Sequence, residues 1–209
     1  MRQILLLMTI VIALFTSTGC GPRIYEAPNV AAAVAAHSII AILPPTVNIQ
    51  GRKKDDPEMI RQAAAADAVA FQREMYSWML RRKQQGRIRG LEIMDPETTI
   101  VKLERAGWSP ENRNMTPAEM AEALNVDAVI TSVYNTTKPM SEGAAVALGV
   151  LFGVWGTTNQ TTVNLTIHDG SAGMLWNYDW VASGTFSTSE MLVDQLMRNA
   201  SRRMPYAVN

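Results

Sequence analysis

The chain has 209 residues, of which 47% are hydrophobic and 18% are charged, with 19 basic and 19 acidic side chains. This length is enough for one folded domain with a hydrophobic core. The balanced charge argues against a nucleic-acid-binding protein, which normally carries a basic excess. The single cysteine excludes an intrachain disulfide and a cysteine-based zinc site.

The start of the chain has the layout of a bacterial lipoprotein signal. A charged start is followed by an apolar run over residues 4–15, and the small residues 17–19 lead to Cys20. This layout resembles the lipobox, in which a diacylglycerol is attached to the cysteine and the signal is removed in front of it. Lipoboxes usually carry Leu where this chain has Ser17. We expect residues 1–19 to be a signal peptide and Cys20 to carry lipid; an ordinary cleaved signal is the alternative.

The residues after the cysteine suggest where the protein is held. No Asp follows Cys20, so a common signal for retention in the inner membrane is missing, and we expect a lipid anchor in the cell outer membrane that faces the periplasm. Residues 20–36 contain two prolines and a run of small residues, and we expect them to be a tether. A single domain is then expected over residues 37–209.

The first half of this domain alternates between strand and helix patterns. Apolar, β-branched runs predict strands over residues 38–43, 88–94 and 126–134. Residues 57–85 predict a long helix, and two shorter helices begin after Asp95 and Thr116, with a proline in the first turn of each helix. The polar residues 48–55 are expected to form a loop. The buried stripe of the long helix is read at Ile60, Ala64, Ala68, Phe71, Met75, Trp78 and Met79.

The second half predicts a strand pair and a closing helix. Residues 161–168 alternate between apolar and polar side chains, residues 169–173 form a turn, and residues 174–182 return as the partner strand. Ser187 and Glu190 form a capping box that opens the last helix. The expected fold is therefore α/β, with a mixed sheet of about five strands in the order strand, helix, strand, helix, helix, strand, strand, strand, helix.

Three of these stretches resemble a family of bacterial lipoproteins. They are the strand and hairpin over residues 163–176, the opening residues 39–45, and residues 124–130. Together they are similar to the superfamily that includes the curli-secretion lipoprotein CsgG, the penicillin-binding-protein activator LpoB and the N-terminal domain of TolB. The resemblance implies an α/β sandwich and a role in envelope assembly or export, and it implies no catalytic residue.

One uncharged stretch departs from an ordinary domain. Residues 143–158 are apolar and contain Gly149 and Gly153 at a spacing that favours close helix contact in lipid. The stretch is shorter than the roughly 20 residues of a membrane-spanning helix. A buried segment, a subunit interface and a membrane contact are the three alternatives. The candidate interface residues are Leu148, Leu151, Phe152 and Trp155.

The residues give little support to an enzyme. His37 and His168 are far apart in the sequence, and the pair His168–Asp169 is explained by a polar strand that ends in a turn. No phosphate-binding loop, nucleophile elbow or metal-ligand spacing is found in the sequence. We therefore expect no catalytic residue, no cofactor and no metal.

Two functional hypotheses follow. The first is a structural or oligomeric component in envelope assembly or export, bound to the membrane through lipid on Cys20 and to itself or to another envelope protein. The alternative is a regulatory module that activates a partner cell-wall enzyme, as the resemblance to LpoB implies. Only about 16 residues separate Cys20 from His37, and such a short tether favours a protein held near its membrane.

Overall fold

The computed structural model describes residues 21–51, 56–88, 90–110, 112, 114–137, 159–184 and 189–208. The strands are β1 (Arg23–Glu26), β2 (Ile39–Ile42), β3 (Thr46–Gln50), β4 (Glu92–Met94), β5 (Ala128–Thr137), β6 (Asn159–Asp169) and β7 (Gly173–Gly184). The helices are α2 (Val30–Ala36), α3 (Pro57–Gln84), α4 (Pro96–Arg105), α5 (Pro117–Leu124) and α7 (Ser189–Ala200). The predicted α/β class is confirmed, with two more strands than expected.

All seven strands belong to one mixed sheet, in the order β1-β7-β6-β5-β2-β4, with β3 also paired to β5. The strands β2, β3, β4 and β5 pair in parallel, whereas β5, β6, β7 and β1 pair antiparallel. The predicted hairpin is confirmed as β6 and β7, with one register shift between Ile167 and His168. The sheet thus has a parallel part and a longer antiparallel part.

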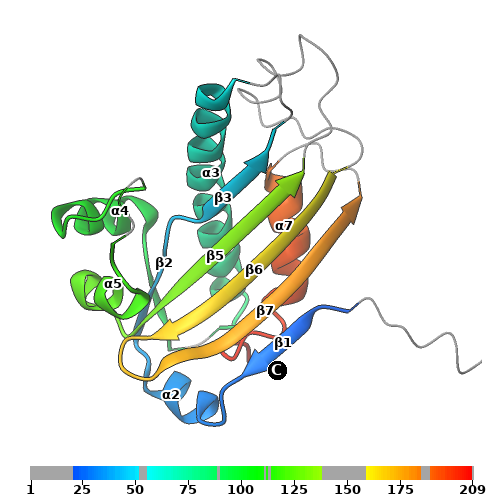
Figure 1. The fold of residues 1–209 in the computed structure, drawn as a ribbon. Coiled ribbons are helices and arrows are strands. Elements are labelled where there is room, and N and C mark those ends of the chain that lie inside the picture. Colours follow the sequence, from blue (N-terminus) through cyan, green and yellow to red (C-terminus); the bar gives the residue numbers. More distant parts are fainter. Residues whose placement is uncertain are drawn as a thin grey trace, which may run out of the picture.

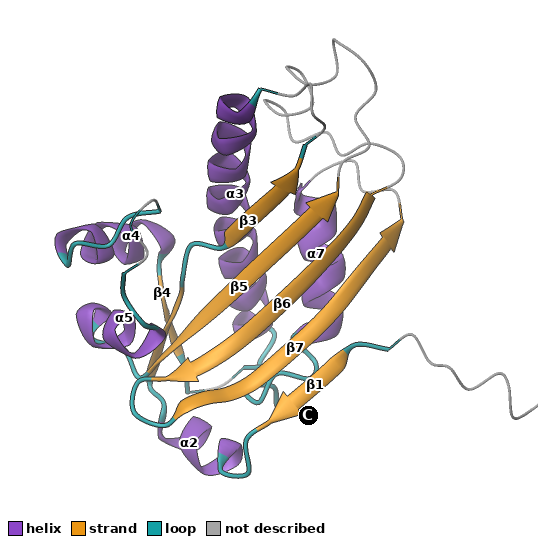
Figure 2. Ribbon diagram, viewed as in Figure 1, coloured by secondary structure: helices purple, strands orange, loops and turns teal. Residues whose placement is uncertain are grey.

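The helices cover the two faces of the sheet unequally. The long helices α3 and α7 pack behind the sheet, as seen in Figure 1, and they also pack against each other. The short helices α4 and α5 lie beside the parallel part, while α2 lies below the hairpin (Figure 2). Helix α5 packs against the start of β5 and the end of β6, and no other described helix lies over the front of β5, β6 and β7.

The segment expected to be a tether is partly folded onto the sheet. Strand β1 pairs with β7, with Arg23 opposite Asp179 and Glu26 opposite Trp176. The backbone N–H of Ala27 donates to the carbonyl of Leu175 at 2.8 Å, and the side chain of Ala27 is buried. The sequence shows no long apolar run here because β1 is an edge strand, and the open backbone edge of β7 supplies its hydrogen bonds. The tether interpretation is therefore corrected for β1.

Two further predictions are corrected by pairing within the sheet. Residues 48–50, expected in a loop, belong to β3, which continues along β5 after the two prolines that follow β2. The strand predicted over residues 88–94 is shorter, since Gly90 has a φ of 67° that interrupts extended backbone. Ile88 instead forms an isolated bridge with Ala207.

Helix starts follow the local sequence signals. Asp56, Asp95 and Thr116 each accept a backbone N–H of the helix that follows, as predicted. Thr116 and Glu119 form the complete capping box. Asn125 ends α5 with a φ of 56°, a left-handed conformation that asparagine adopts more readily than most residues.

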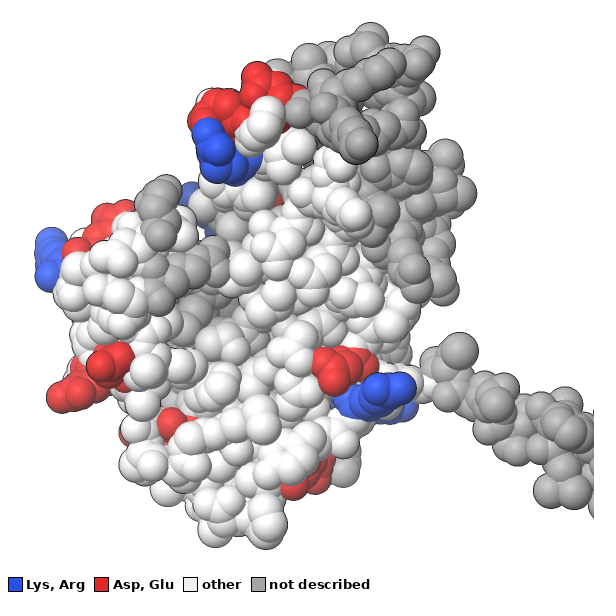
Figure 3. Space-filling view, viewed as in Figure 1, with Lys and Arg blue, Asp and Glu red and all other residues white. Residues whose placement is uncertain are grey.

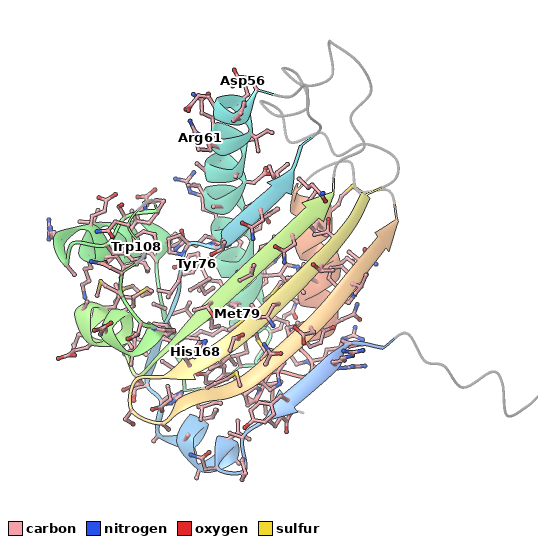
Figure 4. All side chains as sticks on the ribbon, viewed as in Figure 1. Asp56, Arg61, Tyr76, Met79, Trp108 and His168 are labelled. Carbon is pink, nitrogen blue, oxygen red and sulfur yellow. The ribbon has the colours of Figure 1, made fainter. Side chains whose placement is uncertain are left out.

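The core has one part on each face of the sheet. The larger part lies between the sheet and the two long helices; its large buried side chains include Phe71, Met75, Tyr134, Trp176 and Tyr178. The smaller part lies under α4 and α5 and contains Leu43, Leu103, Trp108, Leu124 and Val129. Figure 4 shows Trp108 beside these two helices. The parallel part of the sheet is thus covered on both faces.

The predicted stripe of α3 lies on the core side of the helix, and its members differ in how deeply they are buried. Phe71, Met75 and Met79 are fully buried, but Trp78 is only half-buried at the seam with α7. Its indole Nε1 donates to Asp194 Oδ1 at 2.9 Å, and Arg81 lies over its ring. Gln72 is buried instead and donates to the carbonyl of Ile42 at 2.7 Å. A helix packed against both a sheet and a second helix buries a wider surface than one stripe predicts.

Candidate functional site

Most of one face of the antiparallel part of the sheet is not covered by any described helix, and we call this area the open face; α5 reaches only the start of β5 and the end of β6. In every strand of a sheet, alternate side chains point to opposite faces. Register places the open-face residues of neighbouring strands opposite one another: Thr131, Thr166 and Asn177 form one row, and Val133, Asn164 and Asp179 form the next. Thr162, which lies opposite Asn135 and Val181, belongs to the third row. The side chains that face the helices are those of the larger core.

Hydrogen bonds join the polar side chains of the open face into a chain. Asn177 Nδ2 donates to Thr166 Oγ1 at 2.9 Å, and the Thr166 hydroxyl donates to Asn164 Oδ1 at 2.9 Å. Asn164 Nδ2 in turn donates to Asp179 Oδ1 at 2.5 Å. Two of these bonds join β6 and β7 and the third lies within β6; together they fix the rotamers of the amides, so the face is preorganised before any partner arrives.

The centre of this face is almost free of charge. Figure 3 shows a broad uncharged area over β5, β6 and β7, with acidic and basic atoms near its rim. Val181 and Tyr25 contribute apolar atoms, because their side chains are 54% and 48% exposed. Protein interfaces are depleted of charged residues at their centres and enriched in tyrosine. The composition of the open face therefore fits a protein-binding surface.

His168 lies at one end of the open face, near the turn into β7 (Figure 4). It is half-buried, and burial lowers the pKa of its imidazole. Register places Val129 and Met174 opposite it, and among the described residues His168 has no hydrogen-bond partner. The histidine is therefore favoured in its neutral form, in keeping with the uncharged character of this face.

The adjacent Asp169 does not orient His168, because it bonds the other histidine. His37 Nε2 lies 2.8 Å from Asp169 Oδ2, and His37 Nδ1 lies 2.8 Å from the hydroxyl of Tyr206. The second oxygen of Asp169 accepts the backbone N–H groups of Ser171 and Ala172, which is the Asx turn expected from the sequence. All three members of the group His37, Asp169 and Tyr206 are buried.

The charge state of this buried group suits a structural role. Burial opposes ionisation of Asp169, but hydrogen bonds from His37, Ala172 and Ser171 outweigh it and hold the pKa of the carboxyl well below its usual value. Burial, together with the charges of Asp169 and Asp127, raises the pKa of Tyr206. A buried histidine that bonds both neighbours has no free nitrogen to offer a substrate. The group joins the start of β2, the hairpin turn and the C-terminal segment.

Only some of the predicted site residues lie in the described part of the chain. Cys20, residues 143–158 and the candidate interface residues Leu148, Leu151, Phe152 and Trp155 lie outside the described residues, as does Ser187. The alternation over residues 161–168 predicts a half-buried strand with a polar face, and in the structure most of this face is not covered by a described helix. The partners of His37 carried no sequence signal, because they are far along the chain.

Neither a metal-binding cluster nor a membrane-spanning helix is found in the described part of the chain. They contain no group of three or more His, Cys, Asp or Glu side chains placed to hold a metal ion. None of the helices in the described part of the chain combines the length and the hydropathy that a membrane span requires.

Comparison with known proteins gives distant structural similarities. No family model and no curated protein matches the chain. The structure of lipoprotein GNA1162 from Neisseria meningitidis is similar with a TM-score of 0.40 and 12% identity, over 80% of this chain and 99% of that one.

Two further similarities are to C-terminal domains of LpoB. The domain from Salmonella enterica gives a TM-score of 0.35 at 11% identity, over 74% of this chain and 93% of that one. The domain from Escherichia coli gives a TM-score of 0.30 at 11% identity, over 77% of this chain and 94% of that one. Similarities of this degree do not establish a family or a function, and the resemblance to CsgG and TolB stays a prediction.

Proposed function

We propose that this protein is a periplasmic lipoprotein, anchored in the outer membrane through Cys20, that binds another envelope protein through the open face of its sheet. The observation that carries the proposal is the preorganised and exposed side of β5, β6 and β7, whose centre is free of charge and whose one acidic row member, Asp179, lies on β7 beside the edge strand. A solvated surface normally carries charges of both signs, so an uncharged area of this kind is unusual. The anchor is supported by the lipobox-like layout before Cys20.

The role is binding, with no chemistry assigned to the chain. The only buried His–Asp pair of the described residues is His37 and Asp169, and its hydrogen bonds are saturated by structural partners. The open face offers amides, hydroxyls and apolar atoms, which recognise a protein surface by shape and hydrogen bonding. Within this proposal the chain is a component of an envelope assembly, and activation of a cell-wall enzyme is the alternative role.

A crosslinking experiment in cells tests the binding face. A photo-crosslinking amino acid at Thr162, exposed on the open face, is expected to yield a specific adduct, whereas one at Val101, exposed on α4, is not. A second copy of this chain in the adduct identifies an oligomeric component, and a cell-wall enzyme identifies a regulator. Equal adducts from the two positions would contradict the proposed face.

The anchor and the apolar segment are tested separately. Cys20→Ser should abolish incorporation of labelled fatty acid and release the protein from the outer membrane fraction; continued labelling would contradict the anchor. Self-association through Leu148, Leu151, Phe152 and Trp155 is a further part of the proposal. Replacing Leu151 and Phe152 with Asp should then remove the oligomer while the thermal unfolding transition is retained.

A further inference from the structure

A cluster of five basic residues lies at the opposite side of the sheet from the open face. Arg82 and Lys83 end α3, Arg87 follows in the next turn, and Arg202 and Arg203 follow α7. We call these five residues the basic cluster. The backbone joins its two halves, since the N–H of Val208 donates to the carbonyl of Arg87 at 2.8 Å and Ile88 forms a bridge with Ala207.

The charges of the basic cluster are not neutralised within the described residues. None of its five members forms an ion pair with a described carboxylate. The Arg82 Nε is buried and has no hydrogen-bond partner there. Burial, together with the charges of Arg87 and Arg202, lowers the pKa of Arg82, which shows that the cations are close enough to repel one another. The helix dipole accounts for the basic residues Arg82 and Lys83 in the last turn of α3. It does not account for Arg202 and Arg203, which follow α7 and lie near the same helix end.

Apolar side chains are exposed beside these cations. Ile24 in β1 is 38% exposed, and Val208, which bonds the backbone of Arg87, is 36% exposed. Ile24 pairs with Tyr178 on β7. Burial raises the pKa of Tyr178, and the nearby positive charge of Arg203 partly offsets this rise. Figure 1 shows the C-terminal end of the chain beside β1. The basic cluster therefore borders the edge strand, and the mixture of cations with exposed aliphatic residues is typical of surfaces that lie on a membrane.

The edge strand is also where the chain arrives from the proposed lipid anchor. Only Gly21 and Pro22 separate Cys20 from the first residue of β1. Three residues of extended chain span at most about 11 Å. The headgroup layer on each side of a bilayer is roughly 5–8 Å thick. A lipid on Cys20 would thus keep β1 at the level of the headgroups, with no free tether to carry the domain away.

We propose that the basic cluster binds anionic phospholipid headgroups of the membrane that holds Cys20, so that the domain lies on the bilayer with its open face turned away. The inference rests on the proposed lipid anchor. Arginine and lysine beside a surface of anionic lipid each add to the attraction, and the attraction falls off within a Debye length. A domain held this way presents the open face to proteins of the periplasm.

A fluorescence experiment on the full lipidated chain tests this orientation. Since lipid occupies the natural cysteine, Val208→Cys introduces a single thiol beside the basic cluster for an environment-sensitive dye, and Val101→Cys on α4 serves as the control position. The protein is reconstituted in vesicles of phosphatidylcholine alone or mixed with phosphatidylglycerol. We expect the emission of the dye at position 208 to shift to shorter wavelength only when phosphatidylglycerol is present, and to go back to its original wavelength in high salt. The emission of the dye at position 101 should stay constant in all vesicles.

Charge variants separate lipid binding from other effects. The triple variant R87Q/R202Q/R203Q should lose the shift, whereas R61Q/R73Q/R105Q, which removes three exposed cations elsewhere, should keep it. Circular dichroism of both variants checks folding. An unresponsive dye at position 208, an equal loss in both variants, or a cluster that captures an envelope protein without any response to lipid would overturn the inference. A chain that floats with neither vesicle would instead contradict the proposed anchor at Cys20.

Discussion

Single residues from distant parts of the chain hold the start of β2. Asp127 Oδ2 accepts the backbone N–H groups of Ser38 at 2.6 Å and Ile39 at 2.9 Å, and Asp169 bonds the side chain of His37. Asp127 lies directly before β5, the strand that β2 pairs with, and Asp169 ends β6 on the other side of β5. Charge-assisted hydrogen bonds are about twice as strong as neutral ones, so the two residues fix this strand end firmly.

The same carboxylates predict how stability depends on pH. Backbone hydrogen bonds from Ile39 and Ser38 lower the pKa of Asp127 below its ordinary value of 3.8, and the pKa of Asp169 is lowered as well. Folding therefore favours their ionised forms. The stability they contribute is fully present above about pH 5 and is lost as the pH falls through the folded-state pKa values.

Urea unfolding measured between about pH 7 and pH 2.5 should show a falling free energy of unfolding below about pH 4. Asp127→Asn should make this dependence less steep, since one of the carboxylates is then absent. A free energy of unfolding that is constant across this range would show that the carboxylates have ordinary pKa values in the folded state.

Removing the imidazole of His37 should destabilise the fold. His37→Ala leaves the Tyr206 hydroxyl and one oxygen of Asp169 without their buried partner, at an expected cost of about 2–3 kcal/mol. His168→Ala is the matched control: this histidine is half-buried and unbonded among the described residues, so its loss should cost less than about 1 kcal/mol. Equal losses in a thermal melt would argue against the buried group as a stabilising contact.

At the scale of secondary-structure elements, local sequence decides where helices end and packing decides what they bury. Helix α5 shows the first effect, since the capping box of Thr116 and Glu119 and the left-handed Asn125 involve only residues of the helix and of its two caps. The seam between α3 and α7 shows the second, since Trp78 turns toward Asp194 of the neighbouring helix.

The end of α5 gives a prediction about backbone conformation. Asn125→Ala places a residue with a Cβ and no compensating side-chain amide at a φ of 56°, which should cost about 1 kcal/mol. Asn125→Gly should leave the melting temperature unchanged or raise it, because glycine adopts this conformation without strain. A greater loss with glycine than with alanine would show that the Asn side chain is what matters here.

The helix seam gives a prediction about packing. Phe71→Ala, which empties a fully buried position, should cost about 3–5 kcal/mol, whereas Trp78→Ala at the half-buried seam should cost about 2 kcal/mol. Trp78→Phe keeps the ring and removes the bond to Asp194, so its cost should be about 1 kcal/mol. Chemical denaturation measures the loss in free energy of unfolding for each of the three variants. A loss for Trp78→Ala as large as that for Phe71→Ala would show that Trp78 contributes as much to stability as a fully buried core residue.

At the scale of the whole molecule, the sheet separates two surfaces of different character. The centre of the open face is polar and uncharged, whereas the opposite side is packed with helices and ends in the basic cluster. In our proposals the basic cluster contacts the membrane and the open face binds a protein. The sheet therefore lies between the membrane-binding side and the protein-binding side.

A charge on the open face should affect binding without affecting the fold. Thr162→Glu introduces an anion into the uncharged area at an exposed strand position, so we expect partner recovery after crosslinking from a second open-face position, Asn135, to fall at least tenfold. The melting temperature should change little. Val101→Glu on α4 is the control, and full recovery of the partner with Thr162→Glu would place the interface elsewhere.

The sequence by itself determined the helices and the antiparallel hairpin of this protein. Caps such as Asp56, Asp95 and Thr116 act within one turn of their own helix, and the alternation over residues 161–168 is a property of a single strand. Interactions that close over a few residues leave a spacing that can be read directly.

Only the tertiary structure decided which segments join the sheet and which surfaces remain open. Strands β1 and β3 have only four and five residues, too few for a clear alternating pattern, and they are strands because a neighbouring edge offers hydrogen bonds to their backbones. His37 meets partners 132 and 169 residues away, and the basic cluster unites the ends of two helices. The physical reason is that these contacts depend on chain segments brought together by burial of the core, and no periodicity within either segment records its partner.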